Sequence, residues 1–283
     1  MTWAWLDLTS MKEIKRFQIR GVAGDIKRVD FSGRSVDYWL PKESTERLLI
    51  AHDGQNIFDG GSSTHRGQTW QMAQSAIRVS RELGIAPPAI IGIWHSGTKD
   101  NPLGRMKDLT PEKYFRDGTP FSDEAIAWLG GSFDTTLLHA DTYLRAIFED
   151  YIPAIAPDID PKHTAMIGSS MGGLATLYAL AELPDHFTTA LALSPHWTLG
   201  EHLLVEKIIH SLPKPGGHRV WMSRGTKGLD AKYEPFQLQA DQLMHERGYV
   251  HHDYASKVYK RTGHNERSWA KYLDQPMRFW LSS

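Results

Sequence analysis

The sequence predicts an α/β protein with a mostly parallel central sheet, an N-terminal antiparallel hairpin and helices on both faces. Three observations lead to this fold class. From residue 47 onwards, short apolar runs typical of buried strands alternate with segments of helical periodicity. Before them, the runs 25–32 and 35–41 alternate partially around a Gly-Arg turn, which indicates a hairpin. The chain of 283 residues is 41% hydrophobic and has 10 tryptophans, so it can bury a core of this size.

The expected elements follow one another in a regular order. The expected strands after the hairpin are 47–54, 87–95, 164–170, 188–194, 218–225 and 252–260. The expected helices are 69–84, 139–155, 171–183, 201–211, 234–247 and a last one from about residue 266. The long segment 96–138 looks irregular, and loops of that length are usually lids or binding loops. We therefore expect a single domain, 1–283, with 96–138 as its substrate or lid segment.

Composition removes several classes of function. With 32 basic and 33 acidic residues and no long run of one sign, no nucleic-acid or membrane partner is expected. The absence of cysteine excludes disulfides, thiolate metal sites and a cysteine nucleophile. No H-E-x-x-H or similar ligand spacing occurs, so we expect no metal site. No signal-peptide pattern and no apolar window of about 18 residues is present, which favours a cytoplasmic location unless an export signal has been removed.

The stretch 167–174, IGSSMGGL, is the strongest sign of chemistry. It places Ser170 at the centre of a G-x-S-x-G pattern, between Gly168 and Gly172. The pattern follows an apolar strand and precedes a helix, which is the context of a nucleophile elbow. The neighbouring Ser169 lies outside the central position of the pattern. We expect Ser170 to be a nucleophile at the amino end of a helix, where developing negative charge is favoured.

A serine nucleophile needs a base to accept its proton. Of the 14 histidines, His264 is the best placed, because it follows the final strand in a glycine turn and precedes the final helix. His196 also follows a strand and is the main competitor, although we expect it to line the pocket. The pair His251 and His252 falls at the start of a strand and is less suitable.

The acid that orients the histidine should follow the strand that ends near Gly225. Asp230 is the favoured residue there. Glu234 is an alternative, but it is expected to open the next helix, where a carboxylate complements the helix dipole. Asp253 lies within a strand and is the weaker choice.

Two backbone N–H groups are expected to bind the oxyanion. One belongs to Met171, which follows the serine, and the other to Gln55 in the glycine turn after the strand at 47–54. His52 and Asp53 are expected to brace this turn rather than to take part in the chemistry.

Five motifs together resemble the esterase family of α/β-hydrolases that includes esterase D, enterobactin, feruloyl and acetyl-xylan esterases and the mycolyltransferases. They are HDGQNIFD (52–59), GSSMGG (168–173), SPHW (194–197), GTKGLDAKYEP (225–235) and GHNERSW (263–269). The resemblance covers roughly residues 45–283. It implies an α/β-hydrolase fold with Ser170, Asp230 and His264 as nucleophile, acid and base, and Gln55 and Met171 as oxyanion donors.

The implied reaction is hydrolysis of a small-molecule carboxylic ester through an acyl-enzyme, without a cofactor. The segment IIGIWHSGTKDNPLGR (90–105) is similar to the part of the family in which an arginine contacts substrate, but it carries His95 in place of an asparagine and extra residues before Arg105. Expected substrate contacts are Trp94, His95, Arg105, His196 and Trp197. An acyltransferase, or a non-catalytic binding protein on the same fold, are the alternatives. The sequence leaves the oligomeric state open.

Overall fold

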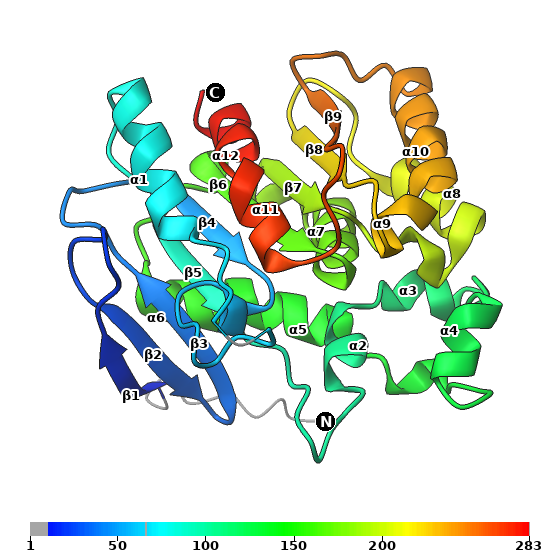
Figure 1. Cartoon of the computed structure of the whole chain (residues 1–283), viewed down its shortest axis with the longest axis horizontal. Coiled ribbons are helices and arrows are strands. Elements are labelled where there is room, and N and C mark those ends of the chain that lie inside the picture. The colour runs from blue at the N-terminus through cyan, green and yellow to red at the C-terminus, as the bar shows by residue number, and fades with distance from the viewer. Residues whose placement is uncertain (1–10, 66, 283) are drawn as a thin grey trace.

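The computed structural model describes residues 11–65 and 67–282, and nine strands in them form one sheet (Figure 1). Its order is β1-β2-β3-β5-β4-β6-β7-β8-β9. The strands are β1 (Met11–Phe17), β2 (Ile26–Phe31), β3 (Arg34–Trp39), β4 (Leu48–Ala51), β5 (Ala89–Ile93), β6 (Thr164–Ser169), β7 (Thr189–Leu193), β8 (Arg219–Arg224) and β9 (Tyr254–Val258). Strands β1, β2, β3 and β5 pair antiparallel in that order, and every further pair is parallel. The predicted fold class is therefore confirmed.

Strand β1 extends the predicted hairpin to a third antiparallel strand. It pairs with β2 in a register that joins Phe17 to Ile26 and Met11 to Phe31. Six of its seven residues are exposed and the seventh is half-buried. Because little of it is buried, its sequence MKEIKRF carries no clear alternation of apolar and polar residues. This edge strand is accordingly absent from the sequence-based expectation.

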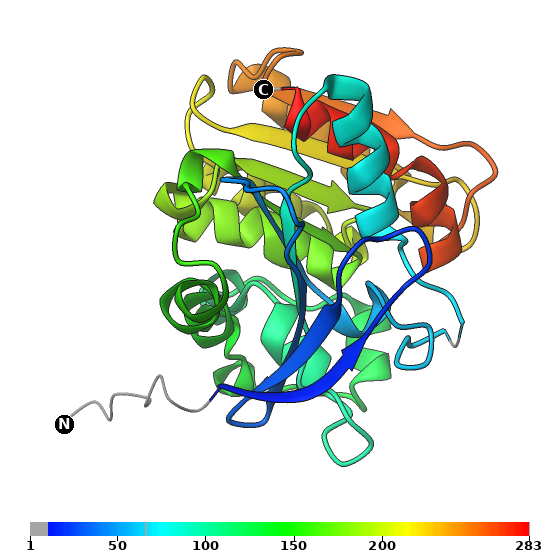
Figure 2. The ribbon, with the colours of Figure 1, turned by 90° about the vertical axis from the view of Figure 1, so that its left-hand side faces the viewer.

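Helices cover both faces of the sheet, as Figure 2 shows. They are α1 (Met72–Leu83), α2 (Gly104–Leu109), α3 (Glu112–Arg116), α4 (Asp123–Trp128), α5 (Ala140–Ala146), α6 (Ile152–Ile155), α7 (Met171–Glu182), α8 (Glu201–Ser211), α9 (Leu229–Lys232), α10 (Glu234–Glu246), α11 (Glu266–Tyr272) and α12 (Asp274–Leu281). Strand β4 shows how the faces separate: Leu48 and Ile50 belong to the core cluster that includes residues of α5, α7, α8 and α10, whereas Leu49 and Ala51 belong to the one that includes residues of α1, α11 and α12.

The helix predicted over 139–155 is continuous but not uniform. A π-helical turn, Ile147–Tyr151, separates α5 from α6. Pro153 follows this turn and has no N–H to donate to the carbonyl of Glu149, so the regular hydrogen-bond pattern is lost there.

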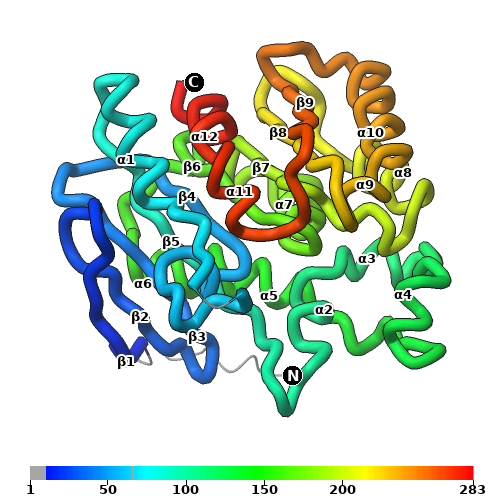
Figure 3. Tube along the Cα trace, in the orientation of Figure 1, coloured from blue at the N-terminus to red at the C-terminus, as the bar shows by residue number. Residues whose placement is uncertain are grey.

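The segment 96–138, expected to be irregular, contains the three short helices α2, α3 and α4. Helix α2 packs on α5 and α7, and α4 packs on the 3-10 turn Trp197–Leu199 (Figure 3). At the start of α4 the Ser122 hydroxyl accepts a hydrogen bond from the N–H of Ala125. We call residues 102–129 the cap, because they lie beside the carboxyl ends of the parallel strands.

The parallel strands bring their carboxyl ends to one edge of the sheet. The turns after β4, β6, β7 and β8 begin at His52, Ser170, Ser194 and Gly225. Ligands of open α/β sheets bind at this edge, so the site is sought there. Among the described residues, no helix is both long and apolar enough to cross a bilayer.

Candidate active site

Ser170 occupies a sharp turn between β6 and α7. Its backbone angles, φ 57° and ψ −124°, lie in a region that residues with a side chain rarely adopt. The turn depends on close contact between two glycines. A Cβ atom added to Gly168 would lie 2.3 Å from the carbonyl oxygen of Gly172. This is the strand–turn–helix geometry that exposes a serine hydroxyl at the end of a strand.

Asp230 and His264, which are 34 residues apart, meet at the same edge. Asp230 Oδ1 lies 2.6 Å from His264 Nδ1. The other carboxylate oxygen accepts hydrogen bonds from the Ser194 hydroxyl at 2.8 Å and from the N–H of Gly225 at 2.6 Å. Asp230 is fully buried, and these three partners hold its carboxylate in one orientation. The His264 ring is further supported edge-on by Trp269, with ring centroids 5.0 Å apart.

The competing acids and histidines are engaged elsewhere. Glu234 forms an ion pair with Arg224 at the start of α10. Asp253 pairs with His252 before β9, at the amino end of that strand, where His251 also lies. Ser169 is the last residue of β6 and is not among the residues that line the cavity described below.

Gly54 allows the turn after β4 to approach β5 closely. A Cβ atom at Gly54 would lie 2.3 Å from the carbonyl oxygen of Gly92, so only glycine fits. The turn continues into a 3-10 helix, Gly54–Asn56, in which the N–H groups of Asn56 and Ile57 are hydrogen-bonded to the backbone. Within the described parts of the chain, the N–H groups of Gln55 and Met171 have no hydrogen-bond acceptor. Both can therefore donate to a bound group.

The residues before Gly54 tie this turn to the cap. Asp53, at φ 54°, accepts hydrogen bonds from Arg105 Nε at 2.7 Å and Arg105 Nη2 at 2.6 Å. Burial opposes ionisation of Asp53, yet the adjacent guanidinium keeps the pKa of its carboxyl below the usual value. His52 is buried, and burial lowers its pKa to about 4. The structure thus gives His52 and Asp53 the bracing position expected from the sequence.

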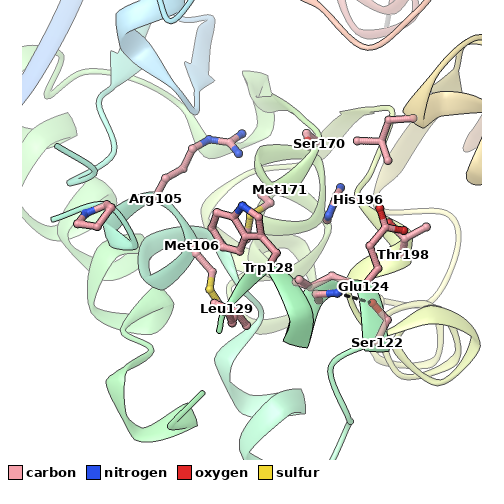
Figure 4. A pocket seen from close by; sticks show the side chains of 14 residues that line it. Arg105, Met106, Ser122, Glu124, Trp128, Leu129, Ser170, Met171, His196 and Thr198 are labelled. Carbon is pink, nitrogen blue, oxygen red and sulfur yellow. Dashed lines mark hydrogen bonds between the residues drawn. The ribbon is translucent and has the colours of Figure 1, made fainter. Parts of the chain in front are cut away.

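A cavity of about 370 Å³ opens beside Ser170 (Figure 4). Fourteen of the described residues line it: Pro102, Arg105, Met106, Ser122, Glu124, Ala125, Trp128, Leu129, Ser170, Met171, His196, Thr198, Leu199 and Leu229. The cap supplies eight of the fourteen. Figure 4 shows the side chains of two of these cap residues, Arg105 and Trp128, together with that of Ser170. Of the five predicted substrate contacts, the structure places Arg105 and His196 in this lining.

The other three predicted contacts lie outside the lining. Trp94 packs under Arg28 of the hairpin, whose guanidinium carbon is 4.3 Å from the centroid of the indole ring. Trp197 is completely buried and donates a hydrogen bond from Nε1 to Gln237 Oε1 at 3.1 Å, as a core residue would. His95 Nδ1 accepts a hydrogen bond from the N–H of Gly97 and so stabilises its own turn.

Tyr233 is a neighbour of the site that sequence reasoning missed. Its hydroxyl lies 2.6 Å from His196 Nδ1, and the N–H of His196 donates a hydrogen bond to the carbonyl oxygen of Ser170 at 3.1 Å. Its ring stands edge-on to His264, with centroids 5.7 Å apart. Burial raises the pKa of Tyr233 well above that of a free tyrosine and lowers the pKa of His196 to about 3, so both are neutral near pH 7. The sequence offered one indication of this. Tyr233 follows Asp230 by three residues, about one helical turn, so the two side chains are expected on the same side of the turn.

The site offers no arrangement of ligands for a metal. Within residues 11–65 and 67–282, no group of three or more histidine, aspartate or glutamate side chains is placed to hold a metal ion.

Comparison of the sequence with known proteins agrees with the motifs. The chain is 32% identical to the ferri-bacillibactin esterase BesA of Bacillus subtilis (strain 168) over 132 residues, which cover 42% of this chain and 40% of BesA. It is 25% identical to the uncharacterized protein YbbA of the same organism over 184 residues, which cover 61% of this chain and 71% of YbbA. The chain thus spans less than half of BesA.

Solved structures share the fold at low sequence identity. The enterobactin esterase Fes of Shigella flexneri, crystallised in the presence of enterobactin, superposes with a TM-score of 0.59 at 18% identity, over 96% of this chain and 59% of Fes. The BES protein of Bacillus cereus gives a TM-score of 0.58 at 17% identity over 99% of both chains. These neighbours support the α/β-hydrolase fold. The family model described as "Putative esterase" matches residues 35–279, which span the sheet from β3 onwards and include the turn at Ser170, and the chain therefore belongs to that esterase family.

Proposed function

We propose that this protein is a serine hydrolase of small-molecule carboxylic esters that works through an acyl-enzyme on Ser170. The observation that carries the proposal is the hydrogen bond between buried Asp230 and His264, at the sheet edge where Ser170 occupies its strained turn. Tyr233 links the two regions: its hydroxyl binds His196, whose N–H donates to the carbonyl oxygen of Ser170, and its ring stands edge-on to His264. A serine, a histidine and a fixed carboxylate together are the parts of a catalytic triad.

In the proposed first step, the Ser170 oxygen attacks the ester carbonyl and His264 takes its proton on Nε2. Asp230 accepts the hydrogen bond from Nδ1, selects the tautomer with a free Nε2, and stabilises the imidazolium that forms. The proton then passes from His264 to the departing alcohol oxygen, which leaves an acyl group on Ser170. Water then attacks the carbonyl carbon of the acyl group while His264 takes its proton. The bond to the Ser170 oxygen breaks, the serine regains a proton from His264, and the carboxylic acid leaves.

The negative charge that develops on the carbonyl oxygen would be bound by the N–H groups of Gln55 and Met171. Both donors are free of other acceptors in the described chain, and both are backbone groups that need no reorganisation. Met171 is the first residue of α7, so the helix dipole adds to the stabilisation. Arg105 and His196, which line the cavity, are the proposed polar contacts of the substrate.

The neighbouring serines provide a matched test of the nucleophile. We expect Ser170→Ala to abolish hydrolysis of 4-nitrophenyl acetate and labelling by a fluorophosphonate, whereas Ser169→Ala keeps both. Circular dichroism checks that each variant is folded, and mass spectrometry of the labelled peptide identifies the modified serine. Labelling at Ser169, or wild-type protein that neither hydrolyses the ester nor becomes labelled, would contradict the proposal.

A further inference from the structure

The cavity beside Ser170 is predominantly apolar. Eight of its fourteen lining residues have apolar side chains: Pro102, Met106, Ala125, Trp128, Leu129, Met171, Leu199 and Leu229. Trp128, at the end of α4, is 68% exposed although it is a large aromatic residue. A ligand that covers an exposed tryptophan in the lining of an apolar cavity buries apolar surface, which favours binding.

The charged groups of the lining are already paired. Both oxygens of Glu124 accept hydrogen bonds from Lys232 Nζ, at 2.9 and 2.8 Å. Arg105 donates hydrogen bonds from Nε and Nη2 to Asp53, and 31% of its side chain is exposed. His196 is neutral near pH 7, because burial lowers its pKa to about 3. The lining therefore presents two neutralised ion pairs and no excess positive charge to attract an anionic ligand.

The position of His264 decides which half of an ester enters the cavity. In the proposed reaction the leaving alcohol is protonated by His264, so the alcohol lies on the His264 side of Ser170. The cavity is bounded by Ser170, by Met171 and by His196, and His264 is not among the described residues that line it. In this arrangement the acyl group, on the other side of the carbonyl carbon, would face the cavity.

We infer that this cavity is an acyl subsite for neutral, apolar acyl groups of medium length, and that it disfavours acyl groups that carry a carboxylate. The inference rests on the proposed ester hydrolysis at Ser170 and adds its substrate class. A volume of about 370 Å³ corresponds to roughly twelve water molecules at ~30 Å³ each, or an acyl group of on the order of ten non-hydrogen atoms.

The first test is the dependence of kcat/KM on acyl length in the wild-type protein. We expect 4-nitrophenyl esters from acetate to octanoate to gain about fourfold per methylene while the cavity fills, the equivalent of about 0.8 kcal/mol per buried CH₂. A charge test accompanies it, because 4-nitrophenyl hexanoate and the 4-nitrophenyl monoester of adipic acid have the same chain length. We expect the hexanoate to be preferred at least tenfold, and equal or reversed preference would overturn the inference.

Helix α4 offers a matched pair of variants. Ala125 lines the cavity, whereas Ala127 is exposed on the same helix and does not line it. Ala125→Trp should lower the octanoate-to-acetate ratio of kcat/KM by at least tenfold, and Ala127→Trp should leave that ratio unchanged. Equal ratios in the two folded variants would overturn the inference.

The outcomes separate the two proposals. Acetate hydrolysis and labelling of Ser170 that persist, without any dependence on acyl length, refute the acyl subsite alone. Loss of all hydrolysis and labelling in the wild-type protein refutes the proposed function, and the subsite with it. The wild-type length series needs no variant, so it decides the question even if Ala125→Trp does not fold.

Discussion

His52 should make the protein less stable in mild acid, by an amount that follows from its burial. Its side chain is 1% exposed, Nδ1 lies 2.8 Å from the Tyr143 hydroxyl, and Nε2 is buried without a hydrogen-bond partner in the described chain. Burial lowers the pKa of His52 in the folded protein to about 4, against about 6.5 for an unfolded chain. Between these values the unfolded chain binds a proton that the folded protein does not, so stability falls as the pH falls from 6.5 towards 4.

The magnitude can be worked out and measured. The linkage relation gives a loss of about 2 kcal/mol between pH 7 and pH 5 from this group alone. Glutamine at this position does not titrate and can still bond the Tyr143 hydroxyl, so His52→Gln should remove that part of the pH dependence. Urea denaturation of wild type and variant at pH 7, 6 and 5, followed by tryptophan fluorescence, gives the difference in unfolding free energy. Between pH 7 and pH 5 the wild type should lose about 2 kcal/mol of unfolding free energy relative to the variant. A constant difference across the three pH values would refute the reasoning.

Three further substitutions test the site. Asp230→Asn should lower kcat by about 10⁴-fold, as in serine proteases, because an amide cannot fix the His264 tautomer, whereas Glu234→Gln should have little effect; the reverse order would move the acid to Glu234. Tyr233→Phe should lower kcat about tenfold with KM nearly unchanged, since it removes the hydroxyl that holds His196 in the cavity lining beside Ser170; a purely structural role would instead lower the Tm at unchanged kcat. Gly168→Ala should destabilise the fold by about 3 kcal/mol in urea denaturation, because its Cβ would meet backbone, and a stable, active variant would show that the turn is not constrained.

The sequence was most informative where elements are long and buried on both sides. Strands such as β6 and β7 are continuous apolar runs, and the parallel order of the sheet follows from their alternation with helices. Strand β1 was not predicted, because most of its residues are exposed and show no apolar pattern. Helices α2, α3 and α4 were not predicted, because five or six residues are too few to show a helical period. Helices this short depend on tertiary contacts for their stability.

The site was predictable in the chain order of its motifs, but less so in its contacts. Motif order predicted that Asp230 and His264 would lie together, and they are hydrogen-bonded; their catalytic roles stay predictions. Proximity in sequence misled for Trp197, which adjoins His196 but points into the core. The turn of α9 brings Tyr233 against both His196 and His264, a relation that no local motif encodes.

The link between Asp53 and Arg105 bears on how specificity can change in this family. It joins the turn that carries Gln55 to the first helix of the cap, so the proposed acyl subsite and the proposed oxyanion donors share one support. A cap grafted from a relative without an arginine at this place would leave a buried carboxylate unpaired in the turn after β4, which is strongly destabilising. Helix α4 is held more weakly: none of its residues is fully buried, and its link to α9 is the exposed Glu124–Lys232 ion pair, which contributes little to stability. We therefore expect exchange of α4 to alter substrate preference while turnover is retained.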